Sequence, residues 1–259
     1  MVATDSEAPL VSVVVPFFNS ERHLAECVES LLSQENVGGP YEVILINNLS
    51  SDESASIVER YPELIVLEQP TPGSYAARNA GIRQARSPLI AFTDADCVAA
   101  KDWLRSILDG MEDPSVAILL GCCLYPAEAS FGLRLLGAYE NSKTRYVTER
   151  CPSVHHYAHA NNMAVRASLF VDSGLFKEWQ RAADTELVHR LAARHPDFRL
   201  RYNLSMKVTH MEFLQTRDRL RRMSLYTQTN SKIDTFRELG PRHRIGVLRQ
   251  LLKDRRSYW

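Results

Sequence analysis

Long hydrophobic runs are missing from this chain of 259 residues, and no stretch approaches the roughly 20 apolar residues that a membrane-spanning helix needs. The start of the sequence contains Asp5 and Glu7 and lacks the succession of charged, apolar and small residues that is typical of a signal peptide. We therefore expect a protein without membrane spans, located in the cytoplasm and at most attached to the cytoplasmic face of a membrane.

Cysteine is also scarce, and its spacing argues against both a disulfide framework and structural zinc. The number of cysteines is odd, two of them are adjacent, and none belongs to a CxxC pair. These features favour a reducing compartment. The five residues are Cys27, Cys97, Cys122, Cys123 and Cys151.

Hydrophobic residues make up 45% of the chain, which is enough for a sizeable core. The formal net charge is zero, yet residues 211–259 carry twelve Lys and Arg against five Asp and Glu. Because no low-complexity linker or internal repeat is present, we predict one domain over residues 1–210, followed by a basic helical extension over residues 211–259.

The first half of the chain alternates buried strands with amphipathic helices. Apolar runs at 11–18, 43–46, 64–67 and 89–92 predict strands, and apolar residues at helical spacing predict helices over 24–32, 53–60 and 74–85. This alternation is typical of an α/β fold with a mostly parallel sheet covered by helices. Right-handed crossovers would bring the strand-end loops to one edge of the sheet.

The alternation weakens after residue 97. We predict helices over 103–111, 131–147 and 184–194, an extended segment over 116–124, and short strands over 163–165 and 206–209. A histidine-rich segment, His155, His156 and His159, lacks the spacing of a metal-binding helix, and we expect it to form a loop facing an acceptor.

Two carboxylates follow the strand predicted over 89–92. Asp94 and Asp96 are one residue apart at the end of that strand, where ligands of parallel sheets gather. Such a pair provides hard oxygen ligands for a divalent cation and, through it, for a phosphate. The alternative is that either Asp serves only as a helix N-cap or turn former.

Five short segments of the chain form an ordered set that includes the opening strand and the Asp pair. They are 13–19 (VVVPFFN), 46–52 (INNLSSD), 76–81 (AARNAG), 93–97 (TDADC) and 161–166 (NNMAVR). In this order they resemble family 2 of the inverting nucleotide-sugar glycosyltransferases, which have the GT-A fold. The resemblance spans roughly residues 11–210, and the five segments together are far more specific than any one alone.

The resemblance implies a site for a nucleoside diphosphate sugar. Base and ribose would lie at the end of the first strand and in the loop after the second, where Asn48 replaces the usual Asp and leaves the nucleotide open. Arg78 could contact phosphate oxygens with two donors at once. The implied donor-binding residues are Pro16, Phe18, Asn48, Asp52, Arg78, Asn79, Asp94, Ala95 and Asp96.

The same resemblance implies the remaining roles. Asp184 matches the catalytic base, although Ala183 stands where many members have a second acid, and Asp184 is also a candidate N-cap. Asp94, Asp96 and His210 are the implied ligands of a Mn²⁺ (or Mg²⁺) ion, because an imidazole favours the softer metal. His159, Asn161 and Asn162 would face the sugar or the acceptor.

The activity implied is metal-dependent, inverting transfer of a sugar, with a UDP-sugar favoured as donor, to a hydroxyl on a sugar, a lipid-linked molecule or another acceptor. A QxxRW segment and membrane helices, which processive relatives carry, are missing, so we expect one sugar or a few to be added. The main alternative is a binding or regulatory module that has lost turnover. A nucleotidyltransferase is less consistent, because residues 17–22 are not a Gly-rich basic loop.

The basic extension has several open roles. Arg217, Arg219, Arg221, Arg222 and Lys232 alternate with apolar residues and could rest on an anionic membrane that bears a lipid-linked acceptor. A solvated helix and a contact in a homodimer are equally compatible with this pattern. The neutral overall charge argues against nucleic acid as a partner.

Overall fold

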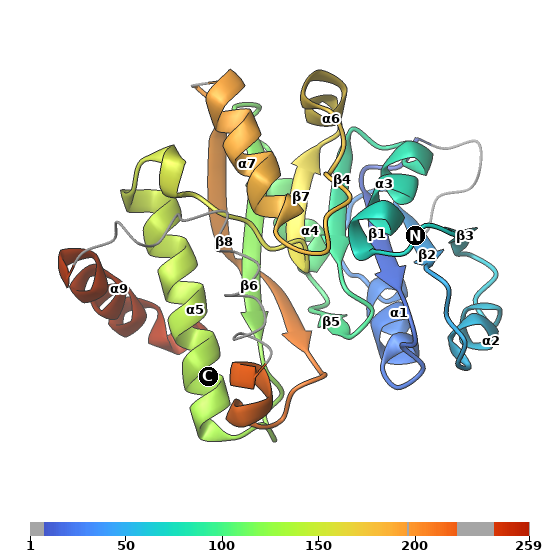
Figure 1. The fold of residues 1–259 in the computed structure, drawn as a ribbon, viewed down its shortest axis with the longest axis horizontal. Helices are drawn as coiled ribbons and strands as arrows, with labels where there is room; N and C mark the ends of the chain where they lie inside the picture. The colour runs from blue at the N-terminus through green and yellow to red at the C-terminus, as the bar shows by residue number, and fades with distance from the viewer. Residues whose placement is uncertain (1–7, 196, 222–240, 259) are drawn as a thin grey trace.

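An eight-stranded sheet forms the centre of the molecule, and the predicted α/β class is confirmed (Figure 1). In the computed structural model, the described residues are 8–195, 197–221 and 241–258. The strands in chain order are β1 (Ser12–Phe17), β2 (Glu42–Asn47), β3 (Ile65–Glu68), β4 (Leu89–Thr93), β5 (Cys97–Ala99), β6 (Val116–Leu124), β7 (Asn162–Arg166) and β8 (Arg199–His210).

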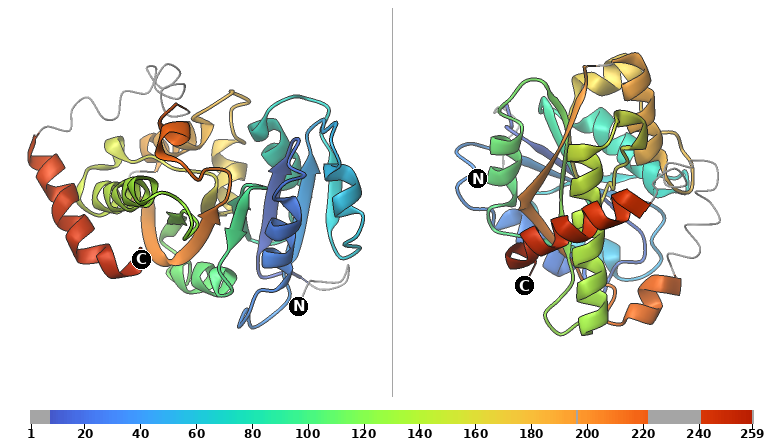
Figure 2. Two further views of the ribbon diagram at one scale, coloured as in Figure 1. Left: turned by 90° about the horizontal axis from the view of Figure 1, so that it is seen from below. Right: turned by 90° about the vertical axis from the view of Figure 1, so that its left-hand side faces the viewer.

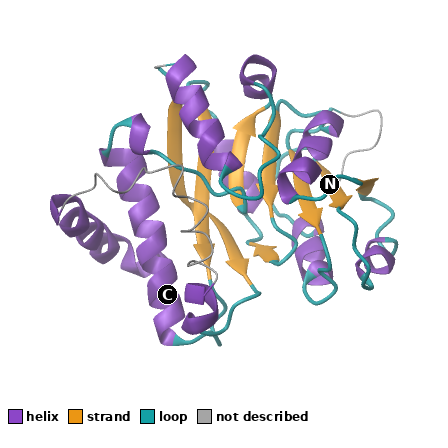
Figure 3. Cartoon of the chain, in the orientation of Figure 1, coloured by secondary structure: helices purple, strands orange, loops and turns teal. Residues whose placement is uncertain are grey.

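Helices cover both faces of this sheet (Figure 3). Side chains alternate along β1: Val13 and Val15 belong to the core cluster under α1, α2 and α4, and Val14 belongs to the cluster under α3, α5, α6 and α7. The helices are α1 (Leu24–Leu32), α2 (Ser54–Val58), α3 (Ser74–Gln84), α4 (Trp103–Gly110), α5 (Phe131–Arg150), α6 (Ser168–Ser173), α7 (Ala183–Arg194) and α9 (Pro241–Asp254).

The strands are arranged so that most of their carboxyl ends lie at one edge of the sheet. The strand order is β3-β2-β1-β4-β7-β6-β8-β5. The pairs β1·β2, β1·β4, β2·β3 and β6·β8 are parallel, and β7 is antiparallel to both of its neighbours, β4 and β6. The carboxyl ends of β1, β2, β4, β6 and β8 therefore point the same way. β7 begins at that edge, because Thr93 pairs with Asn162.

Most predicted elements are present within a few residues of the expected bounds, but the second half contains elements that we did not predict. Helix α6 and the three-residue strand β5 are such elements. The last strand was predicted to cover only residues 206–209, and the structure shows twelve residues from Arg199. Its first half alternates charged and apolar residues, and a register shift between Gly121 and Cys122 of β6 interrupts its pairing.

The C-terminal helix α9 packs on the outer side of α5, as two further views show (Figure 2). Tyr258 is buried, and its hydroxyl oxygen accepts from Ser142 Oγ of α5 at 3.2 Å. The helical character predicted for this part is thus confirmed over 241–254. The division at residue 210 stays a prediction, and Arg222 and Lys232 of the basic extension lie outside the described residues.

Among residues 8–195, 197–221 and 241–258, no helix combines the length and the apolar character required to cross a bilayer.

Helix α3 approaches the sheet closely at Gly81. A Cβ at this position would overlap with the Val14 side chain and lie 2.9 Å from Ile46 Cδ1. Gly81→Ala should therefore lower the free energy of unfolding by about 1–3 kcal/mol, as overpacking does, although Gly→Ala within a helix normally stabilises by about 0.5–1 kcal/mol. Urea unfolding measures the change, and Gln84→Ala on the exposed side of the same helix is the control. Equal stabilisation by both substitutions would contradict this close approach.

Candidate active site

Asp96 and His210 come together at the carboxyl edge of the sheet. The pairing of β5 with β8 places Cys97 opposite His210, and Met211 N donates to Asp96 O at 2.8 Å. The carboxylate of Asp96 lies 3.7 Å from His210 Nε2. One donor atom each from Asp96, Cys97 and His210 lies within 4.8 Å of the others, which makes this group a candidate cation site.

The donor set of this group fits a divalent ion of intermediate softness. Burial and then the charge of Asp96 raise the pKa of the Cys97 thiol well above its usual range, which disfavours the thiolate form that binds metals. A carboxylate oxygen and an imidazole nitrogen remain, and this combination suits Mn²⁺. Asp96 and His210 are thus the residues that would hold the ion.

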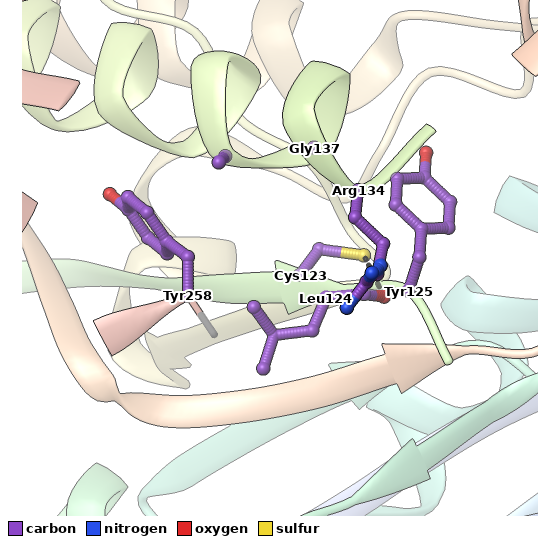
Figure 4. Close-up of a pocket in the computed structure, with 7 residues that line it drawn as sticks. Cys123, Leu124, Tyr125, Arg134, Gly137 and Tyr258 are labelled. Atoms are coloured by element: carbon purple, nitrogen blue, oxygen red, sulfur yellow. Dashed lines mark hydrogen bonds between the residues drawn. The ribbon is translucent and has the colours of Figure 1, made fainter. Parts of the chain in front are cut away.

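Aromatic side chains surround the imidazole of His210. The ring of Tyr125 lies 6.2 Å from it and that of Phe213 lies 5.2 Å from it, centroid to centroid. Gly137 of α5 leaves room for Tyr125, because a Cβ there would lie 2.8 Å from its ring. A small pocket lies on the α5 side of Tyr125, between α5 and the end of β6 (Figure 4). Its lining residues are Cys123, Leu124, Tyr125, Arg134, Gly137, Ala138 and Tyr258.

Asp94 faces a different partner from Asp96. The Arg78 guanidinium forms an ion pair with the Asp94 carboxylate, and the side chains are 5% and 35% exposed, respectively. The guanidinium carbon also lies 5.3 Å from the centroid of the Tyr75 ring. Asp94 is thus neutralised by α3, and it is not part of the three-residue cation group. Its predicted role as a metal ligand stays a prediction.

The loops after β1 and β2 are tied together by side chains. Asn19 Oδ1 accepts from Ser51 N at 2.9 Å, and Asp52 accepts from Glu21 N at 3.0 Å and from Ser54 N at 3.1 Å. The predicted base-binding residues at this place differ in exposure. Phe18 is 59% exposed at the end of β1, whereas Pro16 is buried within it.

Strained backbone accompanies these loops. Asn19 and Leu49 have left-handed φ values of 47° and 68°, and Ala182, directly before α7, has 64°. Residues other than glycine adopt this region rarely, and such outliers often lie at functional sites. Three of the four left-handed non-glycine residues among the described ones are therefore in loops at the edge where the site lies.

The side chain of Asn48 forms hydrogen bonds with the backbone of the loop between β3 and α3. Its amide donates to Gln69 O at 2.8 Å and to Thr71 O at 2.7 Å, and its oxygen accepts from Gly73 N at 2.7 Å. The side chain is buried. Asn48 thus shapes the loop that starts α3, and its predicted contact with the base stays a prediction.

Two other asparagines that we predicted as site residues, Asn79 and Asn162, also form hydrogen bonds that hold the surrounding segments together. Asn79 donates to Phe176 O at 2.9 Å and accepts from Phe176 N at 3.1 Å, which fastens the loop before α7 to α3. Asn162 accepts from Trp103 Nε1 at 2.9 Å and donates to two carbonyls, Cys122 O at 3.0 Å and Met206 O at 2.9 Å. Both are buried, so both position the residues around the site.

The residues predicted to face the acceptor lie beside these segments. Asn161 O accepts from Thr93 Oγ1 at 3.0 Å, and Asn161 Nδ2 lies 3.6 Å from Cys123 Sγ. His159 is exposed, and its ring lies 5.1 Å from that of Tyr157. Ala95, between the two aspartates, is buried.

Asp184 is buried at the start of α7. Its Oδ2 accepts from Ala160 N at 3.0 Å, its Oδ1 accepts from Thr185 N at 2.8 Å, and the Tyr75 hydroxyl also bonds to the carboxylate. Burial raises the pKa of Asp184 above the ordinary value of a carboxyl group, while these donors and the Arg78 charge lower it. A carboxylate with a raised pKa is suited to accept a proton near neutral pH.

Tyr75 and Cys97 are site residues that we did not predict. Tyr75 contacts both Arg78 and Asp184, and the spacing of three residues between Tyr75 and Arg78, which puts both on one face of α3, was an available signal. Cys97 lies within the segment of the Asp pair, but nothing in the sequence indicated its pairing with His210.

Comparisons with known proteins agree with the resemblance. The model for glycosyl transferase family 2 matches residues 12–172. The glycosyltransferase AglE of Haloferax volcanii is 29% identical over 178 residues, which are 66% of this chain and 57% of AglE. The uncharacterized glycosyltransferase EpsJ of Bacillus subtilis is 35% identical over 121 residues, which are 45% of this chain and 34% of EpsJ. The chain thus covers less than two thirds of either relative.

Solved structures share the fold. The mannosyltransferase PcManGT from Pyrobaculum calidifontis, in complex with GDP-Man and Mn²⁺, matches with a TM-score of 0.64 at 20% identity, over 99% of this chain and 76% of that one. S. aureus TarS in complex with UDP matches with a TM-score of 0.60 at 20% identity, over 95% of this chain and 72% of that one. These likenesses show a common GT-A fold.

If Asp96 and His210 bind a metal ion, substitution of either residue should weaken metal binding. Asp96→Asn and His210→Ala should each weaken Mn²⁺ binding by at least about tenfold, because ligand loss should cost no less than the loss of an outer-shell partner. Titration of Mn²⁺ in the presence of UDP or GDP, followed by electron paramagnetic resonance of the free ion, measures the affinity. Asp109→Asn and His155→Ala, outside the group, are the controls, and an unchanged affinity in the first pair would remove this assignment.

Proposed function

The chain belongs to glycosyl transferase family 2, and we propose that it transfers a glycosyl group from a nucleoside diphosphate sugar to an acceptor hydroxyl, with inversion at the anomeric carbon. The observation that carries the proposal is the arrangement of three groups at the edge of the sheet: the Asp96 and His210 pair, the Arg78 and Asp94 ion pair, and the buried Asp184. The first two can bind a diphosphate and the third can take a proton.

The donor would bind across the ends of β1, β2 and β4. Phe18 offers an exposed ring for a base, and the tied loops after β1 and β2 form a preorganised rim around it. A diphosphate could exchange places with Asp94 as the partner of Arg78, because a guanidinium pairs with phosphate as well as with carboxylate. UDP-GlcNAc, a ligand of TarS, and GDP-Man, the ligand of PcManGT, are the first donors to test.

A divalent cation held by Asp96 and His210 would offset the negative charge that develops on the leaving diphosphate. Asp96 and His210 come from segments that are far apart in the sequence but adjacent in the sheet, so the site is held by strand pairing. Mn²⁺ fits the nitrogen and oxygen donors best, and Mg²⁺ is the alternative.

Asp184 would act as the general base toward the acceptor hydroxyl. The carboxylate lies in the first turn of α7 and interacts with Tyr75 and Arg78. No second acid precedes it, because residue 183 is a buried alanine. The acceptor would then enter beside Asn161 and His159, and the chain would add one sugar or a few. A sugar, a lipid-linked molecule or another hydroxyl compound as acceptor, and a homodimer, stay predictions.

A donor-binding module without turnover is the second candidate. It is favoured by the missing acid at Ala183 and by Asn48, whose side chain is fully engaged with the backbone of residues 69–73. Incubation with UDP-, GDP-, dTDP- and CMP-sugars and Mn²⁺ distinguishes the two, because transfer or hydrolysis releases free nucleotide. Thermal stabilisation by a donor without any release would favour the module, and no stabilisation by any donor would refute both.

Asp184→Asn tests the assignment of the base. The substitution keeps the shape of the side chain and removes its basicity, so the rate of transfer should fall by about 10²–10⁴-fold. Donor binding, measured by thermal shift, should remain. Asp172→Asn, at an exposed position of α6, is the matched control. Transfer near the wild-type rate in Asp184→Asn would show that another group accepts the proton.

The pH dependence of transfer tests the environment of Asp184. Only the ionised carboxylate can accept a proton, so the rate should fall as the pH is lowered through the pKa of Asp184, which burial raises. Tyr75→Phe removes a donor that lowers this pKa, and the acid limb of the profile should therefore move to higher pH.

The readout is kcat measured across the pH range. Tyr61→Phe is the control, because within the described part of the chain the Tyr61 hydroxyl bonds to exposed Glu29 alone, at 3.2 Å and away from the site. A uniform loss of rate in Tyr75→Phe, without movement of the acid limb, would indicate that Tyr75 serves packing alone.

A further inference from the structure

The C-terminal helix α9 is fixed to the body of the protein through one face. Val247, Gln250 and Asp254, spaced three and four residues apart, are buried on that face. Asp254 accepts from Arg145 of α5 at 2.6 Å. Gly246 allows the close approach, because a Cβ there would overlap with the Tyr146 ring. The orientation of α9 around its own axis is therefore determined by α5.

The opposite face of α9 is apolar and exposed. Ile245, Leu248 and Leu252 are also spaced three and four residues apart, and they are 51%, 52% and 62% exposed. Three large aliphatic side chains in one row on a helix are more than the isolated apolar residues that protein surfaces normally carry. In the views of Figure 2, α9 lies on the outside of α5, so this row faces away from the sheet.

Cations flank the apolar row on both sides. Between residues 241 and 258 the chain has six Lys and Arg and a single acid, and that acid is Asp254, which faces inward. Helical geometry places Arg244 on one side of the row and Arg249 on the other. All six cations are exposed: Arg242, Arg244, Arg249, Lys253, Arg255 and Arg256.

We propose that this outer face of α9 docks on the surface of an anionic lipid bilayer, with the helix axis parallel to the membrane. Ile245, Leu248 and Leu252 would enter the boundary between headgroups and acyl chains, and the flanking cations would contact lipid phosphates. Charge complementarity selects this occupant. A second copy of the chain would place two such cationic faces against each other, and they would repel. The proposal is independent of the transfer reaction.

Flotation of the full chain with vesicles tests the proposal. The protein should bind vesicles of phosphatidylcholine that contain phosphatidylglycerol, should not bind vesicles of phosphatidylcholine alone, and should dissociate as the salt concentration rises. Arg249→Gln with Lys253→Gln should weaken partitioning by roughly 30-fold, at about one kcal/mol for each cation near the surface. Arg60→Gln with Arg83→Gln, two exposed cations elsewhere, is the charge-matched control.

The apolar row is tested in the same assay. Replacement of Ile245, Leu248 and Leu252 by Ser should reduce binding by at least about tenfold, because three aliphatic side chains no longer enter the bilayer. The same replacement at Val66, Val154 and Val171, which are exposed elsewhere, should leave it unchanged. Circular dichroism checks that each variant is folded, and all substituted positions are exposed.

Failure of the wild type to bind anionic vesicles would overturn the proposal, and so would equal losses in the α9 variants and their controls. Light scattering tests whether a second copy of the chain covers this face instead of a membrane. An oligomer that dissociates when Ile245, Leu248 and Leu252 are replaced would show that it does. Release of nucleotide from the sugar donor is measured in solution for the same variants. A loss of this release would argue against the proposed transfer reaction and not against membrane binding.

Discussion

The short antiparallel pairing between β5 and the end of β8 is the constraint on which the candidate site depends. It joins Cys97 to His210 and Ala99 to Val208, and the backbone bond from Met211 N to Asp96 O extends it by one step. The carboxylate of Asp96 and the imidazole of His210 are thereby held next to each other by strand pairing. Backbone pairing that fixes two side chains in this way lowers the cost of ordering them for a ligand.

Helix α3 connects the other groups of the site. Within one turn, Tyr75 bonds to Asp184, Arg78 pairs with Asp94, and Asn79 holds the backbone at Phe176. Gly81, one turn later, brings this helix against β1 and β2, so the three polar side chains are carried by an element that is firmly packed. The side chains of Asp94 and Asp184 and the backbone at Phe176 are therefore all positioned by a single helix, and a small shift of α3 would affect them together.

Prediction from the sequence succeeded where a local pattern carries the information. The strands β1, β2 and β4 are continuous apolar runs, and the helices between them have apolar residues at helical spacing, so their positions follow from hydrophobic burial alone. Prediction from the sequence failed at β5 and at the first half of β8. Three residues are too short to show a period, and β8 begins with Arg199 and Arg201 alternating with buried residues at the border of the sheet.

The sequence by itself determined the α/β class, the family and the presence of carboxylates at a strand end, because these depend on periodicity and on residues close together in the chain. Only the tertiary structure decided what each polar group does. In the structure, the amides of Asn48, Asn79 and Asn162 form hydrogen bonds with buried backbone groups or with an indole. Asp94 pairs with Arg78, whereas Asp96 lies next to His210. The physical reason is that a buried polar side chain must satisfy its hydrogen bonds with whatever the fold brings near, and those partners lie far away in the sequence.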